Sequence, residues 1–205
     1  MNSSIKITRT GSSEVIIKKS RFLGTAAYVD NEEEARNMVA EVRKQHYDAR
    51  HVCYAYSIGD ENPSLKFSDD GEPGGTAGKP ILSVIQGSGI SNVIIIVVRY
   101  FGGVLLGTGG LVRAYSQAAA EAVEAAEKKT ICMSCLYDVT LEYGDFDKVK
   151  YLLDMNEKVS YEVNYTDKVI VSFSVPEESA EELIKQISEK TAGRSTAKWI
   201  ETKML

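Results

Sequence analysis

Apolar positions along the chain follow two different periods, which predicts a protein that mixes strands with helices. Residues 14–29 are rich in β-branched and aromatic side chains, so we expect one long bent strand or two paired strands there. Residues 49–59 alternate between two faces in the manner of a single strand. The unbroken apolar run within residues 93–101 predicts a strand that is buried on both faces.

Three segments between these strands have the period of a helix. Asn31 followed by Glu34 fits a capping box, and the apolar stripe behind it predicts a helix that runs to about Tyr47. Residues 79–89 predict a short helix with a proline near its first turn. Residues 111–129 predict a long helix that can approach a sheet closely, because its apolar face is mostly alanine. That face contains Leu111, Tyr115, Ala118, Ala119, Ala122 and Ala126.

The pattern changes after about residue 130. The remaining residues predict strand, helix, strand, strand, helix and strand in that order, which matches the ferredoxin-like βαββαβ motif. We therefore expect two α+β domains, residues 1–135 and residues 136–205.

Charge is distributed unevenly between these two parts. The net charge is −5, yet residues 1–135 carry 15 Lys or Arg against 15 Asp or Glu, whereas residues 136–205 carry 9 against 14. A nucleic-acid footprint, if present, must therefore be a local patch on the first part. The beginning of the chain lacks the pattern of a secretory signal, and the longest apolar run, Val93–Val98, is far shorter than the ~20 residues of a membrane span. Three cysteines do not form a disulfide framework. We expect a cytoplasmic protein without membrane contact.

The first of two glycine-rich segments, residues 66–82, contains Gly78-Lys79, which fits the end of a phosphate-binding P-loop. The pattern fails where its first glycine and its magnesium-binding Ser or Thr belong, because Pro73 and Pro80 occupy those positions. Its acids, Asp69, Asp70 and Glu72, suit either metal or acid–base chemistry or the capping of backbone N–H groups, and we favour capping.

The second glycine-rich segment, residues 101–110, precedes the predicted helix 111–129, where free N–H groups and the helix dipole favour an anion. Arg99 and Arg113 flank it and would add two cations, so a phosphate or other anion is one expected ligand of residues 107–113. Alternatively, the glycines permit only tight turns and close packing.

Other candidate sites are weaker. His51 and Cys53 lie on the same face of the predicted strand. Two positions along a strand span roughly 7 Å, which is too far for a hydrogen bond between a nucleophile and its base. Cys132 and Cys135 form a CxxC motif without a second pair and on an apparent strand. We therefore assign no catalytic residue, no metal and no cofactor. Cations beside aromatic residues, as in Arg99-Tyr100, are a pattern used for RNA.

Four segments that lie in order over residues 18–118 read KKSRFLGTAAYV, ARHVCYAYSIG, FSDDGEPGGTAGKPIL and VVRYFGGVLLGTGGLVRAYSQA. Together they resemble the Impact family, specifically its bacterial YigZ-like branch, and residues 138–203 are similar to the small C-terminal domain of that branch. The resemblance implies an N-terminal domain like a small-subunit ribosomal protein and domain IV of elongation factor G, with a four-stranded sheet covered by helices on one face. It implies a C-terminal domain like the ferredoxin-like domain V of the same factor.

The family's marked positions fall in the two glycine-rich segments. The expected ligand-binding or nucleic-acid-binding residues are Asp69, Asp70, Glu72, Gly75, Thr76, Gly78, Lys79, Arg99, Tyr100, Gly107, Gly109 and Arg113. Among them we expect Lys79, Arg99 and Arg113 to contact phosphates, while Asp69 and Asp70 hold the shape of the first loop.

Eukaryotic members of the family act in translational control by interfering with activation of a starvation-sensing kinase, through an additional N-terminal domain. We do not expect the kinase role here, because the chain begins at the shared domain. The resemblance implies a nonenzymatic, translation-associated regulator that binds RNA, the ribosome or a protein partner. Two alternatives stay open: an enzyme that acts on a nucleotide or phosphorylated small molecule through the glycine-rich loops, and a pure protein-interaction module. The sequence leaves the oligomeric state undetermined.

Overall fold

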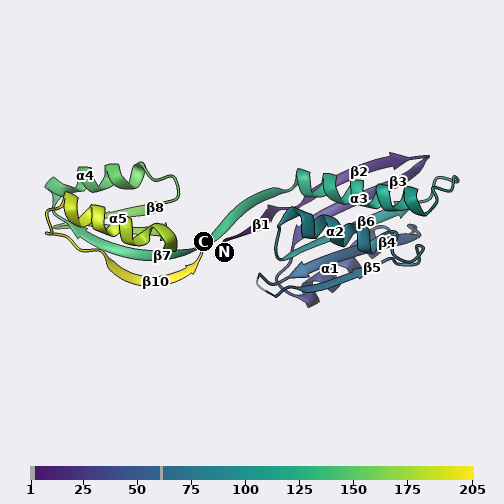
Figure 1. Cartoon of the computed structure of the whole chain (residues 1–205), viewed down its shortest axis with the longest axis horizontal. Helices are drawn as coiled ribbons and strands as arrows, with labels where there is room; N and C mark the ends of the chain where they lie inside the picture. The colour runs from purple at the N-terminus through teal and green to yellow at the C-terminus, as the bar shows by residue number, and fades with distance from the viewer. Residues whose placement is uncertain (1–2, 61) are drawn as a thin grey trace. The chain divides into compact units, whose positions relative to one another are not determined.

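The computed structural model describes residues 3–60 and 62–205, which form an α+β protein with antiparallel sheets (Figure 1). The chain divides into two compact units, Ser4–Thr130 and Ile131–Leu205, and the second also includes Ser3. The boundary that the sequence suggested, near residue 135, falls inside strand β7 (Glu127–Leu141), five residues beyond this division.

The first unit is built on one antiparallel sheet with the strand order β2-β3-β6-β4-β5. Its strands are β2 (Gly11–Ile17), β3 (Ser20–Tyr28), β4 (His51–Ile58), β5 (Ser64–Ser68) and β6 (Val93–Tyr100), and its helices are α1 (Glu32–Gln45), α2 (Gly78–Ser88) and α3 (Thr108–Ala125). The segment 14–29 is a hairpin, so the prediction of two paired strands is confirmed. Asn31 caps α1 as predicted, since its side chain accepts a hydrogen bond from the Glu34 N–H.

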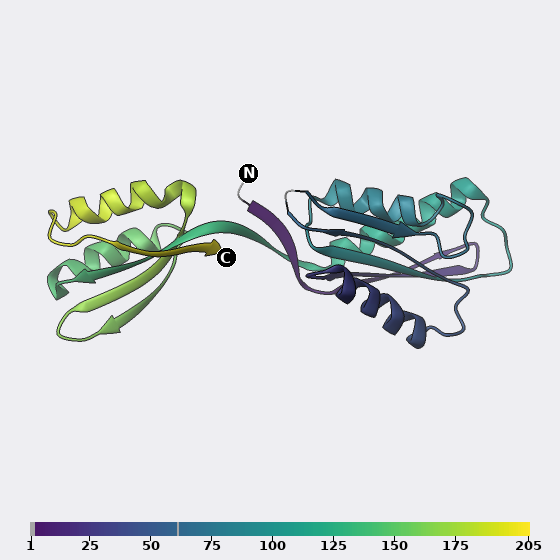
Figure 2. The ribbon, with the colours of Figure 1, turned by 90° about the horizontal axis from the view of Figure 1, so that it is seen from below.

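The expected four-stranded sheet with helices on one face is wrong in two respects. The described sheet has five strands, and helices cover both of its faces: α2 and α3 lie on one side and α1 on the other (Figure 2). The physical reason lies in β6. Ile95 and Val97 pack with α2 and α3, whereas Ile94 and Ile96 pack with α1, so both faces of this apolar strand need a cover.

Two strands were absent from the expectation. Residues 3–9, for which no element was expected, form β1 (Ser3–Arg9), and β5 overlaps the start of the first glycine-rich segment. β5 is an edge strand with mostly exposed side chains, held by backbone pairing with β4. Hydrophobic periodicity misses such strands because backbone pairing leaves no trace in the apolar pattern.

The second unit has the element order that the sequence predicted. Strand β7 is followed by α4 (Tyr143–Asp154), β8 (Ser160–Tyr165), β9 (Val169–Pro176), α5 (Glu177–Lys190) and β10 (Lys198–Met204). Its sheet has the order β1-β7-β9-β8, and β10 also pairs with β7. A separate core is formed between this sheet and the two helices, around Val139, Leu153, Phe173 and Ile187. Within residues 3–60 and 62–205, none of the helices has the length and hydrophobicity needed to cross a bilayer.

Close packing of α3 on the first sheet depends on glycine. The alanine face that the sequence predicted is buried in the core. On the strands beneath it, a Cβ atom added at Gly24 would lie 2.5 Å from the Ala118 carbonyl oxygen, and one at Gly11 would lie 2.1 Å from that of Ala122. Glycine on the strands and alanine on the helix therefore bring the two backbones together.

We predict that Gly24→Ala destabilises the protein by about 1–3 kcal/mol, because the new methyl group overlaps the backbone of α3. Urea unfolding followed by circular dichroism measures this. The matched control is Gly87→Ala inside α2, where an added Cβ meets nothing within 4 Å. That change should be stabilising by up to ~1 kcal/mol, since alanine is the better helix former. Equal unfolding midpoints for the two variants would show that glycine is not required beneath α3.

Candidate functional site

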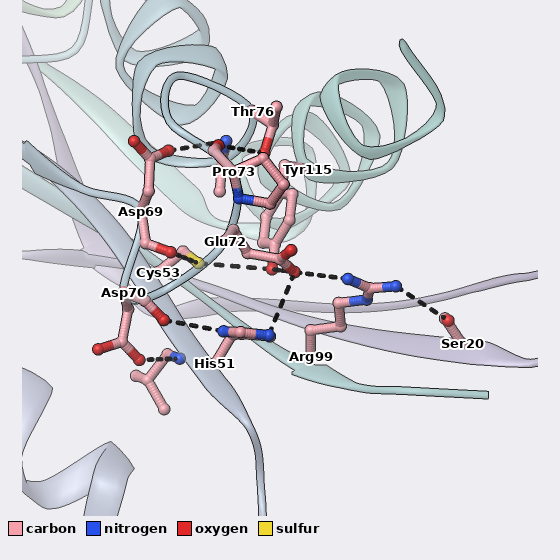
Figure 3. Close-up of polar contacts among 12 residues, drawn as sticks. Ser20, His51, Cys53, Asp69, Asp70, Glu72, Pro73, Thr76, Arg99 and Tyr115 are labelled. Atoms are coloured by element: carbon pink, nitrogen blue, oxygen red, sulfur yellow. Dashed lines mark hydrogen bonds and ion pairs between the residues drawn. The ribbon is translucent and has the colours of Figure 1, made fainter. Parts of the chain in front are cut away.

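The first glycine-rich segment lies over Arg99, near the end of β6, with Tyr115 of α3 beside it (Figure 3). Phe22 of β3, Arg99 of β6 and His51 of β4 lie opposite one another in the strand register. Alternation along the strands directs all three side chains toward the layer of α2 and α3, where the loop 69–77 covers them. These three aligned side chains form the floor of the candidate site.

Asp69 closes the loop by binding backbone N–H groups. Its carboxylate accepts hydrogen bonds from the N–H of Gly75 (2.8 Å), Ala77 (3.0 Å) and Gly78 (2.8 Å). Gly78 begins α2, so the carboxylate supplies acceptors that the first turn of this helix lacks. Partial burial by itself raises the pKa of Asp69, but the three donors together outweigh it and hold the pKa below its usual range.

Asp70 ties the same loop to β4 and α1. One carboxylate oxygen accepts a hydrogen bond from Arg43 Nη2 at 2.7 Å, and the other accepts from the backbone N–H of Val52 at 2.7 Å. Thr76 closes the next turn, since its hydroxyl donates to the Pro73 carbonyl at 2.7 Å. The loop is thus held by its own polar side chains.

Glu72 forms a buried ion pair with Arg99. The two side chains are only 3% and 7% exposed, and Arg99 Nη1 lies 2.7 Å from Glu72 Oε1. The hydroxyl of Tyr115, on the inner face of α3, donates to the same oxygen at 2.8 Å. One carboxylate therefore connects the first loop, the central strand and the long helix.

The groups around Glu72 are held in their protonated forms. Burial raises the pKa of Tyr115 far above its usual range, so its phenol remains a donor. Burial also raises the pKa of the Cys53 thiol to about 12. Cys53 Sγ lies 3.0 Å from the Asp69 carbonyl oxygen and 3.4 Å from the Tyr115 hydroxyl oxygen. Such a thiol is a poor nucleophile.

His51 is oriented by the backbone. Its Nδ1 lies 2.8 Å from the Asp70 carbonyl oxygen, and because a carbonyl only accepts, Nδ1 carries a proton. Its Nε2 lies 3.9 Å from Glu72 Oε1. The histidine therefore packs against the ion pair and supports the loop backbone.

Arg99 also organises the second glycine-rich segment. Its guanidinium carbon lies 5.5 Å from the centre of the Phe22 ring and 5.6 Å from that of the Phe101 ring. Ser20 Oγ accepts a hydrogen bond from the Gly102 N–H at 3.2 Å and lies 3.5 Å from Arg99 Nη2. A Cβ atom at Gly102 would lie 2.0 Å from the carbonyl carbon of Lys19, so only glycine lets this segment rest on the β2–β3 hairpin.

The outer surface of the site carries cations and apolar side chains. Lys79 in the first turn of α2 and Arg113 in α3 are exposed, as are Lys18 and Lys19 at the hairpin tip. Phe101, Val104 and Leu105 of the second segment are 45%, 41% and 82% exposed. Gly107, with φ of 75°, is the N-cap of α3, and Gly109 lies in the first turn of that helix, where backbone N–H groups lack acceptors within the helix.

Two of the expected site residues have positions that differ from expectation. Tyr100 does not lie in the site: it points to the opposite face of the sheet, where its hydroxyl bonds His46 Nδ1 at 2.8 Å and Asp48 at 3.2 Å. Neighbouring residues of a strand face opposite sides, so Arg99 and Tyr100 cannot share a site. Arg99 is 6% exposed and paired with Glu72, not directed outward as a phosphate contact.

Sequence reasoning missed the contributions of Tyr115 and Ser20. Tyr115 was expected only as a core residue, although a buried phenol usually needs a hydrogen-bond partner, which is the signal that could have marked it. Ser20 carried no comparable signal. Among the residues with described positions, no three His, Cys, Asp or Glu side chains are grouped as ligands for a metal ion.

The lowered pKa of Asp69 predicts a pH-dependent contribution to stability. Its carboxylate stabilises the fold above the ordinary Asp pKa, about 3.9, and loses that contribution as the pH falls through the lower folded-state pKa. We expect Asp69→Asn to be less stable than the unaltered protein by about 1–2 kcal/mol at neutral pH. Unfolding in urea, repeated from pH 7 toward pH 3, should show this difference shrinking.

Asp147→Asn, at an exposed position in α4, changes the net charge equally and serves as the control. A pH-independent deficit for Asp69→Asn, or the same pH profile for both variants, would contradict a role for the Asp69 charge.

We predict that Arg99→Met destabilises the protein by about 3–5 kcal/mol, because it leaves the Glu72 carboxylate buried without its cation. The double variant Glu72→Gln with Arg99→Met should recover part of that loss, since no buried charge remains. Thermal and urea unfolding of the single and double variants measure the coupling. If the double variant is as unstable as the sum of the singles, the two side chains are not energetically paired.

Comparison with known proteins agrees with this architecture. The profile of the Impact N-terminal domain matches residues 18–123, and a domain of unknown function, DUF1949, matches residues 139–194. An IMPACT family member from Haemophilus influenzae is 36% identical over 187 residues, covering 90% of this chain and 91% of that protein. The IMPACT family member YvyE of Bacillus subtilis is 32% identical over 201 residues, covering 97% and 91%. A solved crystal structure of a hypothetical protein superposes with a TM-score of 0.63 at 35% identity, covering 98% of both chains. The chain therefore belongs to the IMPACT family.

Proposed function

We propose that this protein is a nonenzymatic, translation-associated regulator of the cytoplasm that binds RNA, free or within the ribosome, through the outer surface of the candidate site. The family's eukaryotic members act in translational control, which is the reason for placing the protein near translation. The binding surface consists of the hairpin tip, the second glycine-rich segment and the exposed cations beside them.

The folds of the two units support this assignment. The C-terminal unit runs βαββαβ with β10, β7, β9 and β8 as neighbours in order, as a ferredoxin-like domain does. The N-terminal unit differs from the implied fold by its fifth strand and by α1 on the second face. We retain the likeness to domain IV of elongation factor G for its shared sheet and helices, as part of the proposal.

The observation that carries the proposal is that the acids of the site are paired within the unit, whereas the cations around it are exposed. Asp69, Asp70 and Glu72 all direct their carboxylates to backbone N–H groups or to arginine. By contrast, the side chains of Lys18, Lys19, Lys79 and Arg113 are exposed and have no ion-pair or hydrogen-bond partner among the residues whose positions are described. A surface whose acids are paired within the unit and whose exposed cations are unpaired attracts phosphate groups.

The second glycine-rich segment adds two further means of contact. Phe101 is half-exposed, and the remaining face of its ring is available to stack on a base, while Arg99 lies near it from within. The first turn of α3 offers N–H groups without side-chain caps or acidic neighbours. Aromatic stacking beside phosphate-binding groups is the usual chemistry of single-stranded RNA recognition.

The same contacts argue against the enzyme alternative. A general base or metal ligand needs a carboxylate with free lone pairs facing a substrate. Here each acid of the first loop holds the loop or the core in place, and the nearby thiol has a pKa of about 12. We therefore assign these residues to the support of the binding surface.

A salt titration tests the proposal. We expect a labelled single-stranded RNA oligonucleotide to bind at low salt, with an affinity that falls linearly on a logarithmic salt axis. Arg113→Ala and Lys79→Ala should each weaken binding and reduce the slope by about 1. The matched control is Lys185→Ala on α5, which removes one exposed charge from the other unit and should leave the slope unchanged.

Two results would overturn the proposal. One is the absence of RNA binding at the lowest salt; the other is an equal loss in Lys185→Ala. If a nucleotide with magnesium instead raises the thermal stability, and Asp70→Ala abolishes that effect, the enzyme alternative takes its place.

A further inference from the structure

The C-terminal unit contains a groove that the proposed RNA surface does not use. It lies between the end of α4, the turn that follows it and the first half of α5, and has a volume of about 680 Å³. The groove is open toward solvent, which suits a segment of another protein more than an enclosed small molecule. Neither glycine-rich segment contributes to it.

The groove has an apolar floor. Leu183 of α5 is buried beneath it, Leu152 of α4 is half-buried, and Met155 at the end of α4 is 68% exposed. The flexible thioether of Met155 can adapt to different apolar partners. The floor therefore suits one apolar side chain from outside.

The rim of the groove is acidic. Glu157, Glu178 and Glu182 line it together with one cation, Lys158, which lies 3.5 Å from Glu178. Glu178 also lies in the first turn of α5, where the helix dipole explains an acid. The dipole does not explain Glu157 or Glu182. The surrounding domain adds to this field, since residues 136–205 carry 14 acids against 9 basic residues.

We propose that this groove docks a basic segment of a partner protein, with an apolar anchor residue on the Leu152–Met155–Leu183 floor and lysine or arginine at the Glu157 and Glu182 rim. The acidic rim repels phosphates, so RNA and anionic lipid do not fit this surface. A basic segment with an apolar anchor satisfies both the floor and the rim. The protein then has two surfaces of opposite preference, one on each unit.

A designed probe tests this docking. The probe is a fluorescently labelled amphipathic helical peptide of leucine and lysine, compared with a peptide in which glutamate replaces every lysine. We expect the lysine peptide to bind the full-length protein and the glutamate peptide not to bind. Amide shifts in nuclear magnetic resonance spectra should concentrate at residues 152–158 and 178–186.

Charge reversal at the rim separates the groove from the general charge of the unit. Glu182→Lys should weaken the lysine peptide by about tenfold or more, because a cation then faces a cation. The control is Glu162→Lys on β8, which changes the net charge equally. Glu162 alternates with Tyr161 and Val163, which pack on the core, so it lies on the face of the sheet away from α4 and α5. Met155→Ala, at an exposed position, should weaken binding without changing its salt dependence.

The proposal is overturned if the two charge reversals weaken binding equally, since that would mean attraction to net charge alone. Equal binding of the glutamate peptide, or shifts confined to other residues, overturns it as well. Loss of RNA binding in the N-terminal variants has no bearing on this result, because the two experiments alter different units.

Discussion

The buried ion pair between Glu72 and Arg99 is the interaction on which the candidate site depends. Glu72 accepts hydrogen bonds from Arg99 and Tyr115, and the Arg99 guanidinium lies near the rings of Phe22 and Phe101, although its buried Nε has no hydrogen-bond partner among the described residues. The pair joins a loop, the central strand and the long helix. Together with the hydrogen bonds of Asp69, Asp70 and Thr76, this pair holds a loop rich in glycine and proline against the sheet.

The site's acids and cations consequently serve different purposes. Asp69, Asp70 and Glu72 resemble catalytic or metal-binding groups in the sequence. In the structure their carboxylates bind backbone N–H groups or arginine and so maintain the conformation of the loop. Lys18, Lys19, Lys79 and Arg113 are exposed and have no ion-pair partner among the described residues. The same division recurs in reverse in the C-terminal unit, where acids surround an apolar groove. The surface proposed for RNA and the groove proposed for a basic segment therefore differ in the sign of their exposed charge.

The glycines at positions 24 and 102 allow two backbone segments to pack closely together. Gly24 allows α3 to approach the sheet, and Gly102 allows the second segment to rest on the hairpin at Lys19. In both places a methyl group would overlap main-chain atoms, which cannot rotate away as a side chain can. The glycine-rich motif that first suggests phosphate binding is therefore, in part, a packing motif.

The sequence by itself determined the elements and their faces. Periodicity predicted the strand 49–59, the alanine face of α3 and the βαββαβ order, because burial on one face leaves a local, regular pattern, and the unbroken apolar run predicted the strand 93–101. Only the tertiary structure decided which charges meet. Glu72 and Arg99 lie 27 residues apart, and their contact follows from the register that aligns Phe22, Arg99 and His51. No local period encodes that register, and none encodes the edge strand β5, which backbone pairing holds. Strand alternation alone predicts that Arg99 and Tyr100 point to opposite faces of the sheet. Only the fold showed which of these two faces contains the site.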